Sequence, residues 1–258
     1  MESNYSRRPV GGLTFRDLRH EDPSLLRTLY RTVLKPSFPA DELEPLPVME
    51  AAISGDGSGA KARAIVAVQK RDQALGGIIS YWYPRSGVLL LGYLAVRPDA
   101  RRQGIGTMLM EHAAQSWFND PECLLAVAEV EDPRHFPKEA SEARLALYGR
   151  LGARILKAPY FQPRVAPGVP RVFHMLLLVF HAQSSICRGG DLDSHAIKSR
   201  VVTAFLTEYF EEAEGAGAVA SDVDIRRLLS FYKGLRLIPL LDPKNYEKVP
   251  DLAQRNGH

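Results

Sequence analysis

Cysteine is scarce in this sequence. The 258 residues include two cysteines, Cys123 and Cys187, which cannot build a disulfide framework or a zinc cluster. Such sparing use is typical of a protein in a reducing compartment. Short metal-binding spacings such as H-E-x-x-H and C-x-x-C are missing, and so is the G-x-S-x-G motif of serine hydrolases. We therefore expect no metal and no nucleophilic serine.

Long apolar runs are missing as well. The longest, residues 88–91 and 175–180, are strand-sized and far short of the ~20 residues that a membrane helix needs. No apolar stretch follows Arg7 and Arg8, so the N-terminus does not resemble a secretory signal. Charge has no strong bias, because 33 basic residues against 30 acidic ones leave a net charge of +3. We predict a cytoplasmic protein that binds neither membrane nor nucleic acid.

What is present is the composition of a globular protein with a substantial core, since 45% of the residues are hydrophobic and 24% are charged. Alternating apolar positions predict strands, and apolar positions three or four apart predict helices. The expected strands are residues 13–18, 62–69, 74–83, 87–96, 124–130, 153–157 and 172–181. The expected helices are residues 24–33, 48–53, 104–117 and 139–151, with loops at 35–46, 55–59 and 159–170.

This order predicts a mixed α/β fold in which an antiparallel meander is followed by a crossover helix, a strand and a further helix. The expected division is a flexible N-terminus (1–12), a main domain (13–181), a linker (182–196) and a C-terminal helical extension (197–258). Apolar residues at helical spacing run along the extension: Ile197, Val201, Val202, Phe205, Leu206, Tyr209 and Phe210. Such an apolar helix face must pack against other protein. We expect it to pack on the main domain or on a second copy of the chain, so the sequence leaves a homodimer possible.

A glycine-containing turn after the fourth expected strand carries the first chemical signal. Gly104 and Gly106 open the helix there, so its first backbone amides and its positive dipole end are accessible to an anion. Arg101 and Arg102 add two cations, and the whole is suited to a pyrophosphate. The lysine of a Walker A loop and the third glycine of a dinucleotide fingerprint are both missing.

The pattern Arg101-x-x-Gly104-x-Gly106, after a strand that ends Val-x-Pro, resembles motif A of the GNAT superfamily of acyl-CoA-dependent N-acyltransferases. A second block resembles motif B of that family, where a helix ends Leu-Tyr-x-x-Leu-Gly; here it reads Leu147-Tyr148-Gly149-Arg150-Leu151-Gly152. The resemblance covers residues 13–181. It implies a GNAT fold, with a central, mostly antiparallel sheet in which two parallel strands, 87–96 and 124–130, splay apart around the cofactor.

The resemblance implies acetyl-CoA as cosubstrate. Strand backbone would bind the pantetheine arm, and the amides of residues 102–107 would bind the pyrophosphate. Ser141 stands where many relatives place an asparagine that contacts the cofactor. The implied cofactor residues are Leu94, Ala95, Val96, Arg101, Arg102, Gln103, Gly104, Ile105, Gly106, Thr107, Ser141 and Tyr148.

Acetyl transfer to an amine needs a base for the ammonium proton and an acid for the departing thiolate. By resemblance, Tyr148 is the expected acid, and its ordinary pKa of about 10 keeps it protonated at neutral pH. Glu129 and Glu131 share one strand face by period-two alternation and are the expected bases. His135 and His174 are alternatives. Four acidic residues form an expected rim that attracts a cationic amine: Asp41, Glu42, Glu44 and Glu50.

These observations predict an acetyl-CoA-dependent N-acetyltransferase that acts by direct attack on a primary amine of a small molecule. Two alternatives stay open: a protein or peptide N-acetyltransferase, and a non-catalytic acyl-CoA sensor. The sequence leaves the acceptor, the acyl length and the identity of the base undecided.

Overall fold

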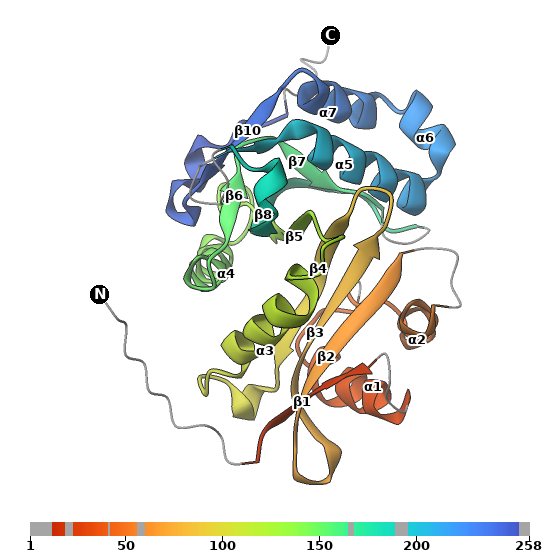
Figure 1. The fold of residues 1–258 in the computed structure, drawn as a ribbon, viewed down its shortest axis with the longest axis vertical. Coiled ribbons are helices and arrows are strands. Elements are labelled where there is room, and N and C mark those ends of the chain that lie inside the picture. Colours follow the sequence, from red (N-terminus) through yellow and green to blue (C-terminus); the bar gives the residue numbers. More distant parts are fainter. Residues whose placement is uncertain are drawn as a thin grey trace. The chain divides into compact units, whose positions relative to one another are not determined.

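The computed structural model describes residues 12–18, 23–40, 42–55, 60–164, 168–188 and 196–252. The chain forms two compact units, each described here by itself. The first comprises the residues up to Tyr81 together with Leu91–Asn119, and the second comprises Trp82–Leu90 together with the residues from Asp120 onward (Figure 1). The expected flexible N-terminus lies, except for Gly12, outside the described residues, and so does most of the turn expected at 55–59.

The first unit is built on the strands at the N-terminal end of the chain. Its strands are β1 (Thr14–Asp17), β2 (Lys61–Gln69), most of β3 (Gln73–Tyr83) and most of β4 (Val88–Val96), hydrogen-bonded in that order. Its helices are α1 (Pro23–Leu29), a π-helical turn (Tyr30–Leu34), α2 (Leu46–Ser54) and α3 (Ile105–Ala113), the last continued by a π-helical turn (Ala114–Phe118). These elements match the predicted ones to within a few residues.

Two adjacent glycines in β3 let helices pack closely on both faces of these strands. A Cβ on Gly77 would lie 2.6 Å from Leu29 of α1, and one on Gly76 would lie 3.2 Å from Ile105 of α3. Successive strand residues face opposite sides, so each glycine removes the side chain that would otherwise hold one helix away. The approach fixes α3, and with it the turn in front of α3.

The second unit is a set of antiparallel strands with helices from the C-terminal part of the chain. Its strands are β5 (Leu125–Glu131), β6 (Arg154–Leu156), β7 (Tyr160–Gln162), β8 (Val172–Ala182), β9 (Ala196–Lys198) and β10 (Leu237–Leu241). They follow the order β5-β8-β6-β10-β9, and β7 also pairs with β8. The helices are α4 (Lys138–Arg150), α5 (Ser199–Glu214), α6 (Ala216–Ser221) and α7 (Val223–Lys233). The predicted mixed, mostly antiparallel α/β class is confirmed.

Two expectations need correction. Residues 159–170 are not wholly a loop, because residues 160–162 form β7 against β8. The C-terminal extension is also not purely helical, since it contributes β9 and β10, and β10 pairs with β6 through Leu240 and Leu156. Both misses have the same cause: strands of three residues, and a strand interrupted by Pro239, carry too little pattern to be recognised.

The extension packs against residues of its own chain in the second unit. Its apolar stripe is buried as predicted, with Phe205, Leu206 and Phe210 fully enclosed. Phe205 lies edge-on to Tyr83, which belongs to the tip of the β3–β4 hairpin, residues 82–90. The division at residues 181 and 196 stays a prediction. Within the described ranges, every helix is too short or too polar to cross a membrane.

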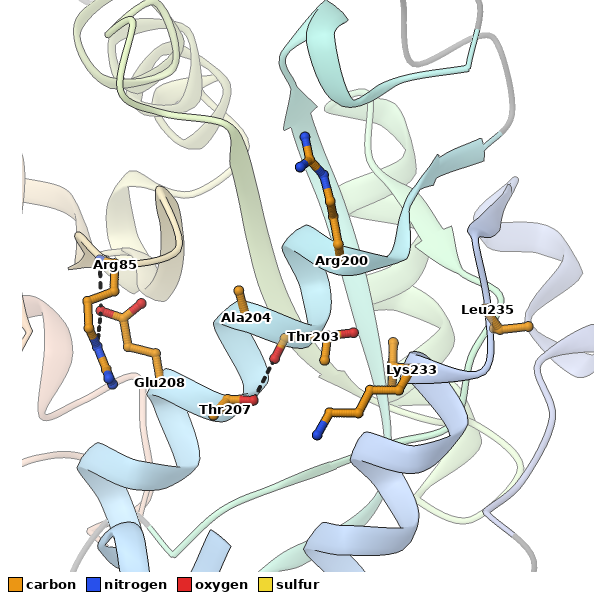
Figure 2. A pocket seen from close by; sticks show the side chains of 9 residues that line it. Arg85, Arg200, Thr203, Ala204, Thr207, Glu208, Lys233 and Leu235 are labelled. Carbon is orange, nitrogen blue, oxygen red and sulfur yellow. Dashed lines mark hydrogen bonds and ion pairs between the residues drawn. The ribbon is translucent and has the colours of Figure 1, made fainter. Parts of the chain in front are cut away.

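Buried Glu208 of α5 ties the extension to that hairpin tip. Its carboxylate accepts hydrogen bonds from the amides of Arg85 and Ser86, at 3.1 and 2.8 Å. Figure 2 shows Glu208 reaching the tip at Arg85 from α5, beside an open cavity of about 530 Å³. Turn amides that would otherwise lack acceptors are thus satisfied by a residue more than a hundred positions away.

Truncation of Phe205 tests the role of the extension in stability. Phe205→Ala leaves a cavity beside Tyr83, and substitutions of this kind cost about 3–5 kcal/mol. Val223→Ala is the matched control, because Val223 is 46% exposed and its loss should cost less than about 0.5 kcal/mol. Urea unfolding of the full chain at 25 °C measures both. Equal, small effects would show that α5 adds little to stability.

Candidate active site

The turn between β4 and α3 is the first part of the candidate site. Gly104 has φ +82° and caps the N-terminus of α3, a backbone conformation that favours glycine. Arg102 is also left-handed, with φ +63°. Two left-handed residues so close together curl the chain tightly, and for Arg102 the conformation is strained.

This curl leaves a run of backbone amides facing outward. Within the described ranges, none of the amides of residues 102–107 donates to a backbone carbonyl, and the first bond of α3 runs from Met108 N–H to Gly104 O at 3.0 Å. A Cβ on Gly106 would touch only Val96, at 3.8 Å, so the space before this amide is open. Successive free amides at a helix N-terminus can hold the oxygens of a phosphate group.

The other predicted cofactor residues of this segment flank the curl. Arg101 is exposed, and its Nε donates to the carbonyl of Val96 at 3.1 Å. Gln103 is exposed and donates to Asp99 O, whereas Ile105 is buried and anchors the helix. Thr107 is exposed. On β4, Leu94 and Val96 are partly exposed, and Ala95 between them is buried. All these residues belong to the first unit, and their cofactor contacts stay predictions.

Glu129 on β5, in the second unit, lies among hydrogen-bond donors. The hydroxyl of Tyr160 and the amide of Gln162, both on β7, donate to its carboxylate, the latter at 2.7 Å. A third donor is the hydroxyl of Tyr209 on α5, at 3.4 Å. Burial raises the pKa of Glu129 to about 7, although the three hydrogen bonds offset part of the rise. At neutral pH this carboxyl can therefore both take up and release a proton.

The donors around Glu129 were not foreseen from the sequence. Tyr160 and Gln162 fall in the segment expected to be a loop, and their one sequence signal is the alternation Tyr160-Phe161-Gln162. In the structure this alternation places Tyr160 opposite Met175 of β8, while Glu131 pairs with Met175 from the other side. Tyr209 was expected only as part of the apolar stripe of the extension. It is buried, as predicted, but its hydroxyl reaches the carboxylate.

Glu131, the other candidate base, has a different environment. Its Oε2 accepts a hydrogen bond from Ser141 at 3.1 Å and pairs with Arg144 at 2.8 Å. Ser141 is fully buried at the start of α4 and also donates to the carbonyl of Pro137. The Ser141 hydroxyl thus has protein partners, and its cofactor contact stays a prediction. Of the two carboxylates, Glu129 is the one without a cationic partner among the described contacts.

Tyr148, the candidate acid, lies on α4 in the second unit and is partly buried. Its ring is edge-on to Phe180 of β8, with centroids 5.5 Å apart. In the described part of the chain its hydroxyl has no hydrogen-bond partner. Burial raises the pKa of Tyr148, and the nearby charge of Arg144 only partly opposes this. The phenol is therefore protonated at neutral pH and free to donate.

Four of the other candidates, Glu44, Glu50, His135 and His174, have partners of their own. In the first unit, Glu44 accepts a hydrogen bond from Tyr81, and Glu50 pairs with Arg27 at 2.8 Å. Asp41 lies outside the described residues. His135 and His174 stack on each other, with ring centroids 3.9 Å apart, and are not among the described hydrogen-bond partners of Glu129. Two of the four residues of the expected acidic rim, Glu44 and Glu50, are thus bonded to other residues of the first unit.

Comparison with known proteins adds the family. Residues 60–152, which include both motifs, match the family model of the acetyltransferase (GNAT) domain. The chain contains a GNAT acetyltransferase domain. The search of curated proteins gave no match.

Solved structures of several acetyltransferases are similar to part of the chain. A protein from Bacteroides thetaiotaomicron assigned to the GNAT family has a TM-score of 0.51 and 22% identity, covering 64% of this chain and 85% of its own. The ribosomal-protein-S18-alanine N-acetyltransferase of Escherichia coli has a TM-score of 0.44 and 17% identity, covering 65% and 92%. Diaminobutyrate acetyltransferase from Paenibacillus lautus, solved with its substrate and coenzyme A, has 0.42 and 16%, covering 65% and 93%. The first likeness confirms the predicted GNAT fold.

The pKa of Glu129 makes a stability prediction. Between about pH 4.5 and 7, folded protein holds a proton on Glu129 that unfolded protein has released, so folding stability falls as pH rises through this window. Glu129→Gln cannot ionise and removes this fall. From pH 5 to pH 8 we expect wild type to lose about 2–3 kcal/mol more than the variant, by urea unfolding.

Tyr209→Phe is the matched variant for this measurement. The hydroxyl of Tyr209 lowers the pKa of Glu129 by stabilising the charged carboxylate. Without this hydroxyl the pKa of Glu129 should rise further, so folding stability should continue to fall up to a higher pH. Parallel pH dependences for wild type and Glu129→Gln would contradict a raised pKa of Glu129.

Proposed function

We propose that the protein is an acetyl-CoA-dependent N-acetyltransferase that acetylates a primary amine of a small molecule by direct attack. The observation that carries the proposal is the Glu129 carboxyl group. It accepts hydrogen bonds from three donors, has no cationic partner among the described contacts and has a pKa of about 7. These are the properties of a general base that works near neutral pH.

The first step is loss of a proton from the acceptor, because an ammonium ion has no lone pair for attack. Deprotonated Glu129 attracts the cationic amine and takes one of its protons. The nitrogen lone pair then adds to the thioester carbonyl carbon and forms a tetrahedral oxyanion. Glu131 is not assigned this role, since its carboxylate is already paired with Arg144. Tyr160, Gln162 and Tyr209 orient the Glu129 carboxyl group and keep its charge tolerable.

The second step is collapse of the oxyanion, which re-forms the carbonyl, breaks the carbon–sulfur bond and expels the CoA thiolate. The nitrogen, which became positively charged on attack, releases its second proton to water and leaves the neutral amide. Tyr148 is assigned the proton that this thiolate takes up. A phenol with a raised pKa is protonated at neutral pH, and in the described part of the chain this proton is not donated to another hydrogen bond. The amide run 102–107, with Arg101 and Arg102, is assigned the pyrophosphate of the cosubstrate.

A small acceptor is favoured by the surroundings of the proposed base. Tyr160 and Tyr209 are both buried, and the hydroxyl group of each contacts the Glu129 carboxylate. A slender alkyl amine can reach a carboxylate between two buried tyrosines more easily than a folded protein surface can. A protein acceptor would have to present a flexible terminus or a lysine side chain.

Gly106 tests the assignment of the pyrophosphate. Gly106→Val places a branched side chain in front of the amide run and should weaken acetyl-CoA binding at least tenfold, measured by isothermal titration calorimetry. Gly106→Ala controls for folding, because its Cβ meets Val96 at an ordinary 3.8 Å and alanine favours the helix. Wild-type affinity in Gly106→Val would contradict the assignment of the pyrophosphate to this amide run.

The reaction itself is tested by CoA release from acetyl-CoA with a panel of acceptors: alkyl diamines, amino acids, a short peptide and a lysine-rich protein. We expect turnover with small amines, rising with pH through about 7 as Glu129 loses its proton. Glu129→Gln should lower kcat/KM by ~10²–10⁴ and abolish this rise.

Tyr148→Phe should lower kcat by about 10² while the Kd for acetyl-CoA changes little, since only a group that acts in the transition state is lost. Turnover restricted to the peptide or protein would favour a protein N-acetyltransferase. Tight binding of acetyl-CoA with no turnover on any amine would favour a sensor and overturn the proposal.

A further inference from the structure

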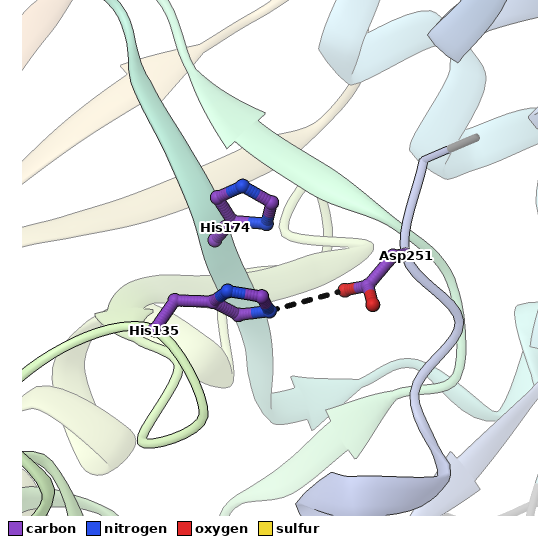
Figure 3. A group of neighbouring side chains, drawn as sticks. All are labelled: His135, His174 and Asp251. Atoms are coloured by element: carbon purple, nitrogen blue, oxygen red, sulfur yellow. Dashed lines mark ion pairs between the residues drawn. The ribbon is translucent and has the colours of Figure 1, made fainter. Parts of the chain in front are cut away.

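Two histidines and an aspartate, distant in sequence, converge in the second unit. His135 lies in the loop after β5, His174 lies on β8, and Asp251 follows the 3₁₀ turn Pro243–Lys248. One side-chain donor atom of each lies within 4.8 Å of the other two (Figure 3). Figure 3 shows a ring nitrogen of each imidazole on the side of the Asp251 carboxylate. The proposed acetyl transfer uses none of these residues.

The imidazole rings are stacked, with centroids 3.9 Å apart and planes inclined by 18°. His135 Nε2 lies 3.5 Å from Asp251 Oδ1, slightly beyond hydrogen-bond distance. Two imidazoles and a carboxylate are a common ligand set for zinc and similar divalent transition ions. Metal bonds of about 2.1 Å at tetrahedral angles put ligand atoms about 3.4 Å apart. The donor atoms must therefore move closer, and the two stacked rings must tilt apart so that both nitrogen lone pairs point at one ion.

The backbone at His174 supplies a second, independent observation. His174 has φ +60°, a left-handed conformation within a β-strand, which costs about 1–3 kcal/mol and persists where the surroundings enforce it. Beside His174, the pairing of β7 with β8 shifts register between the pairs Tyr160–Met175 and Gln162–Val172. The carbonyl of His174 accepts a hydrogen bond from the amide of Asp132, at 3.2 Å. Strain of this kind is concentrated at ligand sites.

Arg134 is a hydrogen-bond partner of the Asp251 carboxylate. Its guanidinium binds both oxygens of buried Asp132 and also donates to Asp251 Oδ1, at 3.3 Å. Metal-ligating carboxylates are commonly oriented by such outer hydrogen bonds. The negative charge of Asp132, which is paired with the same guanidinium, offsets the repulsion between Arg134 and a cation at Asp251.

We propose that His135, His174 and Asp251 form a binding site for a divalent transition ion of the zinc class. His174 and Asp251 line a cavity of about 440 Å³, so water or a small ligand can complete the coordination from that side. The ion would fasten the C-terminal segment at Asp251 to β8 and to the loop after β5. The absence of short metal-binding spacings predicts no metal, but His135, His174 and Asp251 lie far apart in the sequence and are brought together only by the fold.

The experiment is titration of Zn²⁺ alone into metal-stripped, full-length protein, followed by calorimetry. We expect one Zn²⁺ per chain, with binding weakened at least tenfold in His135→Gln, His174→Asn and Asp251→Asn. Asparagine tolerates the left-handed backbone of position 174, so His174→Asn removes the ligand without new strain. His112→Asn is the control, because His112 lies on α3 in the first unit and stacks on Phe15. It should bind as wild type does.

Thermal unfolding provides a second readout. Saturating Zn²⁺ should raise the Tm of wild type and of His112→Asn but not of Asp251→Asn, since a ligand stabilises only a fold that binds it. Absence of Zn²⁺ binding, or binding that survives in all three ligand variants, would overturn the proposal. A circular dichroism spectrum matching that of wild type shows that a non-binding variant is folded.

Discussion

A carboxyl group that leaves water must find hydrogen-bond donors or a cation, and Glu129 meets this constraint with donors alone. The donors come from β7 and from α5, which begin about 30 and 70 residues further along the chain. The carboxylate therefore joins three elements that no local interaction would bring together. With no cation beside it in the described contacts, burial dominates and the pKa is about 7. One desolvated group thus sets both the local architecture and the chemistry proposed for it.

The same logic recurs along the extension, with a different outcome. Glu208 satisfies the amides of the hairpin tip, and Glu214 is held by Arg171, whose guanidinium is nearly inaccessible. Arg171 holds the pKa of Glu214 below its usual value, the opposite of the shift at Glu129. A cationic partner makes a buried carboxylate structural, whereas neutral donors leave it able to exchange protons. The extension carries both kinds of contact, so it is built into the second unit and is not an appendage.

Periodicity was enough to predict the long elements, and the glycine pattern around Gly104 was enough to predict the turn before α3 and the family. These signals are local: they depend on side-chain alternation and on backbone conformations that few residues tolerate. The Glu129 donors and the His135–His174–Asp251 group depend instead on which strands become neighbours. Three-residue strands such as β7 and β9 are too short for their alternation to be recognised, and Pro239 interrupts the strand pattern of β10. The sequence therefore named the proposed base but not its surroundings.

The pairing of β10 with β6 also orders events during synthesis. The edge of β6 that faces away from β8 is completed only by residues around Leu240, roughly 80 residues further along. At ~5–20 residues per second the ribosome needs roughly 4–16 s to supply them. Throughout that interval a nascent chain with its central strands already made carries an open strand edge, the kind of surface that pairs with neighbouring chains. Neighbouring ribosomes on one message would present the same edge together, so β10 acts late, as the strand that closes this edge.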